Sequence, residues 1–231
     1  MTNTLRDLFA GLAPSYERVN HMLTLGLDVR WRAAAARTAV RAGGTLWLDV
    51  CSGTGDMARE LRRRARPDTR IVALDFCRPM LEESVARAVR EGPFEFVLAD
   101  VQTLPFPGRT FDLITISFAT RNIHLSRRVL TETFGEFRRV LRPGGRFVNL
   151  ETSQPRFGPA RFLFRSYVRT IVLPLGSRMS GSKAGYAYLS SSIPEFYSAE
   201  ELTAILKEAG FRHVAFRRFL FGAAAVHIAV K

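Results

Sequence analysis

The stretch LDVCSGTGD, residues 48–56, decides the fold of this chain of 231 residues. An apolar run ends at Val50, and Gly53 and Gly55 then mark a tight turn. A helical pattern begins at Asp56. Glycine lets a ligand come close to the backbone, and the N-terminus of a helix offers free N–H groups. The stretch therefore predicts a buried strand, a ligand-binding turn and a helix, in that order.

Strand and helix patterns alternate downstream of this stretch. Apolar strands that alternate with helices are typical of a parallel sheet covered on both faces. The predicted strands are 45–50, 70–75, 94–100, 111–118 and 146–150, and the predicted helices are 56–66, 79–90 and 127–141.

The two ends of the chain complete one α/β domain. An Ala- and Arg-rich helix is expected over 28–41, before Gly43 and Gly44. Ser198 has the pattern of a helix N-cap, and strands at 211–219 and 223–230 predict a terminal hairpin. The expected parts are a helical lead-in over 1–44, a cofactor-binding core over 45–151, a helical cap insert over 152–197, and a last helix with the hairpin over 198–231. The fold is a doubly wound, mainly parallel sheet with an antiparallel last strand.

Composition excludes several classes of protein. Apolar residues make up 47% and charged residues 24%, which is typical of a globular domain rather than a disordered chain or a coiled coil. Cys51 and Cys77 form neither a disulfide framework nor a zinc motif, so no metal site is expected. No apolar run is long enough to span a membrane, and no signal peptide opens the chain, so we expect a cytoplasmic protein.

The net charge of +13 permits contact with nucleic acid or with an anionic membrane surface. Most basic residues are scattered arginines, a bias that genome composition alone can produce. We therefore do not expect nucleic-acid binding, although a charge-driven nucleic-acid binder stays open as an alternative.

Three predicted strands carry aspartates at their carboxyl ends. Asp75 lies 22 residues after Gly53, where an acidic residue can accept both hydroxyls of a ribose. Asp100 is placed to meet an adenine edge, and Asp49 precedes the glycine turn. Because the carboxyl ends of parallel strands meet at one edge of a sheet, these groups predict a nucleoside-binding site.

Two classes of cofactor use such a site. Gly53, Gly55 and Ala58 satisfy the fingerprint G-x-G-x-x-G/A, so an NAD-dependent oxidoreductase is one candidate. The helical lead-in, the LRPGGRF turn at 141–147 and Asp49 favour S-adenosylmethionine instead. A carboxylate beside the glycine turn repels a pyrophosphate but suits the ammonium group of a methionine moiety.

Further motifs make the sequence resemble a known family. YERVNHMLTLGLDVRW at 16–31, TLPFPGRTFDLITISFATRNI at 103–123 and LETSQP at 150–155 occur in family order. GYAYLSSSIPEF at 185–196, EAGF and AAVH at 224–227 follow. The chain resembles class I (Rossmann-like) methyltransferases, and more closely the family that C-methylates the quinone ring in menaquinone and ubiquinone biosynthesis. The resemblance implies methyl transfer from S-adenosylmethionine to a lipophilic, prenylated quinol.

The resemblance also assigns site residues. The expected cofactor contacts are Gly53, Thr54 and Gly55 in the turn, Asp75 at the ribose, Asp100 and Val101 at the adenine, and Ser117. Arg121 and Asn122 would face the ring, and Tyr16 would lie on the substrate side. The chain departs from the family pattern mainly on that side, so another lipophilic phenol stays open as the substrate. The departures are Glu17, Ala119, Thr120, Thr152 and Ala229.

Methyl transfer to carbon requires an electron-rich ring, and a hydroquinone becomes one when a hydroxyl loses its proton. Arg121 is the candidate for stabilising the phenolate, because a fixed cation lowers the pKa of a neighbouring hydroxyl; the alternative is a surface salt bridge. Asn122 orients Arg121 or the ring, or it caps the next helix. Packing is favoured over proton relay for Tyr16, and a core position over a catalytic one for His227. No general base is identified.

Within the cap, Arg161, Arg165 and Arg169 recur every four residues and stack on one face of a helix. A basic amphipathic helix of this kind can lie at a membrane interface. It can equally form a lid over an apolar substrate or lie on the domain surface with its arginines extended into water. Peripheral contact with an anionic membrane is the expectation, and the oligomeric state is left open.

Overall fold

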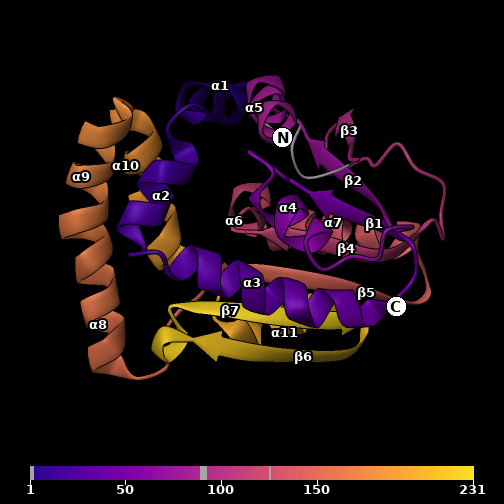
Figure 1. The fold of residues 1–231 in the computed structure, drawn as a ribbon. Helices are drawn as coiled ribbons and strands as arrows, with labels where there is room; N and C mark the ends of the chain where they lie inside the picture. Colours follow the sequence, from indigo (N-terminus) through magenta and orange to yellow (C-terminus); the bar gives the residue numbers. More distant parts are fainter. Residues whose placement is uncertain (1–2, 89–92, 125) are drawn as a thin grey trace.

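The computed structural model describes residues 3–88, 93–124 and 126–231 and shows a central sheet between two layers of helices (Figure 1). The strand order in this seven-stranded sheet is β3-β2-β1-β4-β5-β7-β6. Strands β1 to β5 pair in parallel, and β7 runs antiparallel to both of its neighbours. The strands are β1 (Leu46–Val50), β2 (Arg70–Asp75), β3 (Glu95–Leu98), β4 (Phe111–Ser117), β5 (Leu141–Thr152), β6 (Arg212–Phe219) and β7 (Ala224–Val230). The predicted fold class is confirmed.

Each face of the sheet is covered by apolar helix surfaces. Helices α3 and α4 pack on one face, where small alanines of α3 lie over Trp47 and Leu113. Helices α7 and α11 pack on the other face, where Phe134 and Phe137 meet Phe147. Successive residues of β1 point to opposite faces, as the alternation of side chains along a strand requires. The helices of these layers are α3 (Leu27–Ala39), α4 (Asp56–Arg62), α5 (Arg78–Ala88), α7 (Arg127–Val140) and α11 (Ala199–Glu208).

The remaining helices gather beside the carboxyl ends of the parallel strands. Buried side chains of the lead-in and of the segment after β5 form a third apolar cluster, with Tyr186 fully enclosed. Figure 1 shows α8, α9 and α10 together at the left of the molecule, with α1 and α2 beside them. These elements are α1 (Asn3–Leu12), α2 (Tyr16–Leu23), α6 (Thr120–Ile123), α8 (Gly158–Tyr167), the π-helical turn η2 (Val168–Val172), α9 (Leu173–Ser180) and α10 (Lys183–Glu195).

Several element boundaries differ from prediction, and the helix predicted over 56–66 ends at Arg62. The turn expected at LRPGGRF lies inside β5, as an irregularity where the register against β4 shifts between Phe111 and Leu113. Gly144 adopts a φ of +76° there, and a Cβ on Gly145 would lie 2.9 Å from the Arg142 carbonyl oxygen. Strand β3 is shorter than predicted and ends at Leu98. The end of the helix predicted over 79–90 lies outside the described residues.

Local signals fix the last helix and the hairpin. The Ser198 hydroxyl accepts a hydrogen bond from the Glu201 N–H, and the Glu201 carboxylate accepts one from the Ser198 N–H. This capping box satisfies donors that the first turn of a helix leaves free. Short 3₁₀ turns complete the chain at η1 (Val40–Ala42) and η3 (Leu220–Gly222). Within the described residues, no helix combines the length and the apolar character needed to cross a membrane.

Candidate functional site

A pocket lies at the carboxyl ends of β1, β2 and β4, at the edge where the sequence predicted a site. It holds about 570 Å³, including its open side. The turn after β1 forms one wall, and Asp75 and Ser117 close the ends of the neighbouring strands. Phe9 of α1 and Tyr16 of α2 line it from the lead-in. The structure therefore brings together residues from four separate parts of the chain.

The two glycines of the turn have different surroundings. Gly53 has a φ of +55°, and no heavy atom lies within 4 Å of the position that a Cβ would take, so its face of the turn is open to a ligand. Gly55 has a φ of +82°, and its Cβ would lie 2.2 Å from the Ser84 hydroxyl oxygen. Gly55 thus allows α4 to approach α5 and does not line the pocket, whereas Gly53 and Thr54 do.

Asp75 holds the turn and faces the pocket. Its Oδ2 accepts a hydrogen bond from the Gly53 N–H at 2.8 Å, and its Oδ1 accepts one from the Cys77 N–H at 2.9 Å. Burial raises the pKa of this carboxyl to about 6, against the opposing effect of the backbone donors. The Ser52 hydroxyl lines the same pocket, is buried, and has no hydrogen-bond partner among the described residues. Both groups have capacity for further hydrogen bonds to a ligand.

Asp49 lies deeper, beneath the turn. Its Oδ1 accepts a hydrogen bond from the Thr115 hydroxyl at 2.6 Å, and its Oδ2 has no partner among the described residues. Burial raises its pKa to about 7, although the Thr115 hydrogen bond favours the charged form. A cation held nearby would return this carboxyl to its charged form.

Asp100 and Val101 do not line the pocket in this structure. Val101 is buried in the core of the sheet, and Asp100 accepts a hydrogen bond from the Gln102 N–H at 2.9 Å. Both follow the early end of β3 and lie in a turn rather than at a strand end. Their predicted contact with an adenine stays a prediction.

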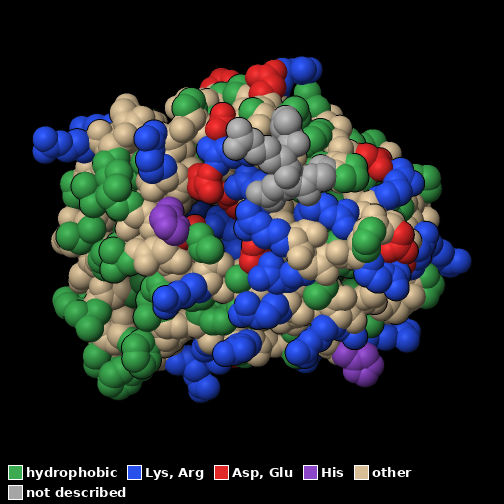
Figure 2. Space-filling model, in the orientation of Figure 1, with side chains coloured by type: hydrophobic (Ala, Val, Ile, Leu, Met, Phe, Trp, Pro, Cys, Tyr) green, Lys and Arg blue, Asp and Glu red, His purple; other side chains and the backbone are tan. Residues whose placement is uncertain are grey.

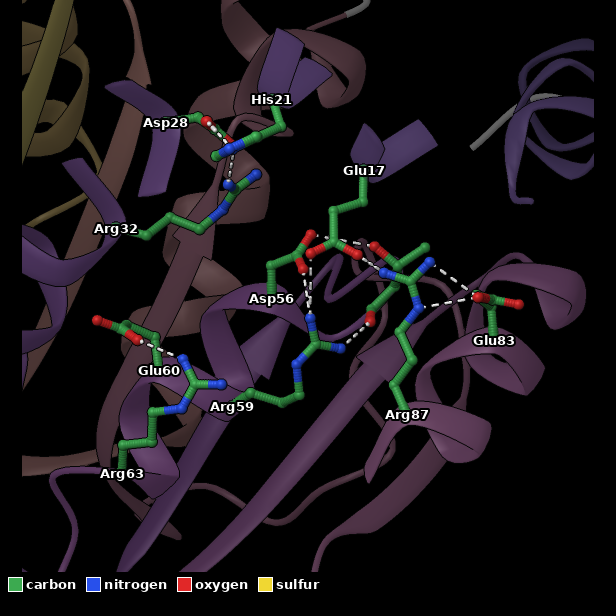
Figure 3. A network of polar contacts seen from close by, with 11 residues as sticks. Glu17, His21, Asp28, Arg32, Asp56, Arg59, Glu60, Arg63, Glu83 and Arg87 are labelled. Carbon is green, nitrogen blue, oxygen red and sulfur yellow. Dashed lines mark hydrogen bonds and ion pairs between the residues drawn. The ribbon is translucent and has the colours of Figure 1, made fainter. Parts of the chain in front are cut away.

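An ion-pair network fastens the lead-in over the turn (Figure 3). Glu17 of α2 pairs with Arg59 of α4 at 3.5 Å and with Arg87 of α5. Arg59 also pairs with Asp56 at 2.6 Å, and Arg87 with Glu83 at 2.8 Å. The sequence marked Glu17 only as a departure from the family pattern. Its partners come from two other helices, and no local spacing reveals them.

A second, largely apolar cavity adjoins the first pocket. It holds about 1180 Å³, including its open side, between α2, α3, α8 and α10. Tyr16, Arg32 and Phe118 line both cavities, so the two share a wall. Burial raises the pKa of Tyr16, outweighing the opposite effect of nearby arginines, so its phenol stays protonated at neutral pH. This cavity was not predicted, because its walls come from segments far apart in the sequence.

Arg121 lines the second cavity as half of a buried ion pair. Its Nη1 donates to Glu151 Oε1 at 3.1 Å and to the Thr152 hydroxyl at 3.2 Å. Its backbone N–H also donates to Glu151, and its Nε has no partner among the described residues. The alternative of a surface salt bridge is wrong, because both side chains are buried. Glu151 was missed, since it stands 30 residues away on β5.

Asn122 lines the first pocket and accepts a hydrogen bond from the Tyr188 hydroxyl at 3.4 Å. The alternative that it caps the next helix is wrong: Ser126 is the N-cap of α7 and accepts from the Val129 N–H. Asn122 thus joins the β4 end to α10.

Arg32 is a second buried cation at this wall, and sequence reasoning missed it. Its Nη1 donates to Asp28 Oδ2 at 2.6 Å, and its guanidinium lies 5.2 Å from the centre of the Phe118 ring. Its Nε has no partner among the described residues. Figure 3 shows the Asp28 carboxylate between Arg32 and His21. The spacing of four residues between Asp28 and Arg32 was the available signal.

Two other predicted residues lie away from both cavities. His227 is buried, and its Nε2–H donates to the Ala199 carbonyl at 2.9 Å. Burial lowers its pKa to about 4, so it is neutral at physiological pH, and its expected core position is confirmed. Ala229 packs in the core of the sheet, whereas Thr152 lines the second cavity. The described residues contain no group of three or more His, Cys, Asp or Glu side chains placed to hold a metal ion.

Solved structures match this fold. A SAM-dependent methyltransferase from Aquifex aeolicus superposes with a TM-score of 0.58 at 18% identity, covering 85% of this chain and 88% of that chain. A SAM-dependent methyltransferase from Thermotoga maritima gives a TM-score of 0.62 at 17% identity, covering 97% of this chain and 99% of that chain. At these identities the likeness shows the fold alone.

Sequence relatives are much closer. A protein of Thermus thermophilus named demethylmenaquinone methyltransferase is 38% identical over 222 residues, covering 96% of this chain and 98% of that protein. A protein of Geobacter sulfurreducens named ubiquinone/menaquinone biosynthesis C-methyltransferase UbiE is 36% identical, covering 98% and 88%. The profile of one family matches residues 2–231. The chain belongs to the ubiE/COQ5 methyltransferase family.

Proposed function

We propose that this protein transfers a methyl group from S-adenosylmethionine to a ring carbon of a prenylated quinol, with demethylmenaquinol as the leading substrate. The observation that carries the proposal is the large apolar cavity that shares a wall with the pocket at the strand ends. Two cavities arranged in this way can hold an apolar methyl acceptor beside a polar methyl donor. We infer that residues 1–231 act as one catalytic domain.

The residues of the first pocket fit the cofactor. The open face of Gly53, the partnerless Ser52 hydroxyl and the Asp75 carboxylate offer a close backbone approach and acceptors for a ribose diol. Thr54 and Ser117 line the same space. S-Adenosylmethionine supplies an electrophilic methyl group there. The buried Asp49 suits the ammonium of its methionine moiety through charge. We also assign Asp100 and Val101 to the adenine and Gly55 to the shape of the turn.

Arg121 stabilises the phenolate form of the quinol. Its guanidinium is buried, so its interaction with a ring oxygen is weakly screened. Glu151 holds it in place and offsets much of its charge, so its effect is that of an oriented donor more than of a free cation. Arg32 offers a second buried donor on the shared wall. The ring hydrogen that the methyl group replaces leaves as a proton.

Asn122 and Tyr16 orient the ring. Asn122 is held by the Tyr188 hydroxyl, and Tyr16 lies between the two cavities. The rest of the second cavity is largely apolar and accepts the first part of the prenyl tail; its apolar residues include Leu23, Phe164 and Leu189. A quinol with such a tail resides in a bilayer, so the reaction also requires the protein to approach a membrane surface.

A series of quinols with one ring and tails of increasing length tests this assignment. The Michaelis constant should fall as the tail grows by the first few isoprene units, because each buried CH₂ contributes about 0.8 kcal/mol. It should level off once the cavity is full. A Michaelis constant that does not change with tail length would show that the second cavity does not bind the tail of the substrate. It would leave open the second candidate, another lipophilic phenol, which the departure at Thr152 beside Arg121 favours.

A further inference from the structure

Exposed apolar side chains gather on one face of the molecule. Of the twelve large hydrophobic side chains that are exposed among the described residues, ten fall in residues 22–29, 157–175 and 220–221. The most exposed are Leu25 at 85%, Phe221 at 82% and Phe162 at 71%. Figure 2 shows hydrophobic side chains along the left side of the molecule, where Figure 1 places α8 and α9. We call these three segments the docking face.

The three segments are neighbours and surround the mouth of the second cavity. The Tyr167 hydroxyl of α8 donates a hydrogen bond to the Leu23 carbonyl of α2. The turn between β6 and β7 packs closely on the start of the cap: a Cβ on Gly222 would lie only 3.2 Å from the Pro155 Cα. Leu25 and Leu220 are both exposed and part of the cavity lining, so they stand where the cavity opens.

Three of these exposed residues have backbones in the left-handed region. The φ angles are 52° for Leu25, 44° for Leu220 and 55° for Phe221. Residues with a Cβ rarely adopt this conformation, and glycine would suit each position better for stability in water. The fold thus holds large apolar side chains in solvent at a cost, which points to contact with an apolar phase.

Three arginines that form no ion pair with any described residue border the same face, and they also line a hollow that includes Glu195 and Glu201. Arg161, Arg165 and Arg169 make no ion pair with any described residue, and the first two donate only to backbone carbonyls and a Gln154 amide oxygen. Together with Phe162 they line one shallow hollow on α8. Residues 152–194 hold five arginines and one lysine but no aspartate or glutamate.

We propose that the docking face binds the surface of an anionic bilayer. Phe162, Leu163, Leu25 and Phe221 enter the acyl boundary, and Arg161 and Arg165 of α8 and Arg169 of η2 bind lipid phosphates. The cavity then opens directly into the apolar phase. A second copy of this chain fits the face less well, because two such cationic surfaces repel each other. The consequence for catalysis rests on the proposed function, but the binding itself does not.

Vesicle flotation with the full chain tests the proposal. The protein should float with phosphatidylcholine vesicles containing phosphatidylglycerol at least tenfold more than with pure phosphatidylcholine, and this preference should shrink as salt rises. Substituting all three arginines, R161Q/R165Q/R169Q, should abolish the preference. The control R66Q/R70Q/R109Q removes the same charge near the amino ends of the strands, and this variant should keep the preference for anionic vesicles. Equal loss in both triple variants would overturn the proposal in favour of net charge alone.

A second pair of variants tests the apolar part. Phe162→Ser with Leu163→Ser should lower binding to anionic vesicles at least tenfold. Val85→Ser with Leu98→Ser alters the two exposed large hydrophobic side chains that lie outside the docking face among the described residues. This variant should bind anionic vesicles as well as the unmodified protein does. Unaltered binding of the first pair would contradict insertion of the apolar side chains.

Activity separates this proposal from the function. Phe162→Ser with Leu163→Ser should keep methyl transfer to a short-tailed quinol in solution and lose it, by at least tenfold, with a long-tailed quinol in vesicles. Equal activity on both would contradict delivery from the bilayer. Vesicle binding as predicted, together with no methyl transfer to any quinol by the unmodified protein, would refute the proposed function and leave the docking face standing.

Discussion

At the scale of single residues, the Arg121–Glu151 pair links the stability of the site to its chemistry. Both side chains are buried, and each satisfies the charge of the other. Removing one partner of such a pair leaves an uncompensated charge in a low-dielectric site. The pair therefore fixes the position of the Arg121 guanidinium at the wall of the second cavity.

Arg121→Met should lower the free energy of unfolding by about 3 kcal/mol or more, because Glu151 is left buried and unpaired. Arg121→Met with Glu151→Gln should recover much of this loss, although neither variant should transfer methyl groups at a normal rate. Urea denaturation of the two single variants and the double variant measures the coupling. Additive losses would show that the two side chains do not depend on each other.

The buried carboxyls predict how cofactor affinity depends on pH. Burial raises the pKa of Asp75 to about 6 and that of Asp49 to about 7 in the free protein. Ribose hydroxyls and an ammonium group favour the charged carboxylates, so binding lowers both pKa values. Protonation below about pH 8 therefore opposes binding, whereas above about pH 8 both groups are already charged.

The dissociation constant of S-adenosylhomocysteine should be constant above about pH 8 and rise as the pH falls through 7 and 6, by about tenfold per unit for each group that must lose a proton. Asp75→Asn should weaken binding more than tenfold and flatten the part of the profile near pH 6. Isothermal titration calorimetry at several pH values measures this. A flat profile in the unmodified protein would show that neither carboxylate contacts the cofactor.

At the scale of secondary-structure elements, local signals predicted the sheet and the N-cap of the last helix well. Strand 70–75 was placed at its observed bounds, and Ser198 was recognised as an N-cap. The bulge in β5 was read as a turn, because Pro and two glycines give the same local signal in either setting. The short β3 leaves Asp100 in a turn, which no spacing indicated.

The candidate site divides in the same way. The glycine turn, Asp75 and Ser117 were found because they occupy the carboxyl ends of parallel strands, a position that the order of elements determines. Arg32 and Glu151 were missed, because their roles depend on how α3 and β5 meet the end of β4. The second cavity depends on packing among four helices and has no sequence motif.

The junction of α9 and α10 provides a test of this packing. A Cβ on Gly176 would lie 2.1 Å from the ring of Tyr186, which is fully buried and cannot move aside. Gly176→Ala should speed hydrogen exchange in α9 and α10 by about tenfold or more, equivalent to about 1.4 kcal/mol of local stability. Amides of the sheet should be unaffected.

Gly158→Ala in α8 is the matched control, because no heavy atom lies within 4 Å of its Cβ position. Exchange in α9 and α10 should stay at the level of the unmodified protein in this variant. Faster hydrogen exchange throughout the sheet in Gly176→Ala would contradict the idea that α9 and α10 open independently of the sheet.

At the scale of the whole molecule, the main feature is a pair of adjoining cavities that differ in polarity. One lies over the strand ends and is partly polar, and the other is apolar and opens at the docking face. The lead-in helices cover their junction and are held by the Glu17 network. In the proposed reaction, the polar donor and the apolar acceptor enter from different sides.

Thermal unfolding separates the two classes of cofactor that the glycine turn allows. S-Adenosylhomocysteine at about 100 times its dissociation constant should stabilise the protein by about 2.7 kcal/mol, and NADH should not. A rise in melting temperature with NADH alone would support the dinucleotide alternative.

The most direct test of the central claim is methyl transfer itself. The full chain would be incubated with radiolabelled S-adenosylmethionine and reduced demethylmenaquinone, with a demethylated benzoquinol in parallel. Label should appear in a ring-methylated quinone, and only when the ring is reduced. The rate of methyl transfer should fall at least a hundredfold in Arg121→Met, which corresponds to about 2.7 kcal/mol of transition-state stabilisation. Tight binding of S-adenosylhomocysteine without label in either quinone would contradict the proposed function and would direct the search to a different acceptor for the apolar cavity.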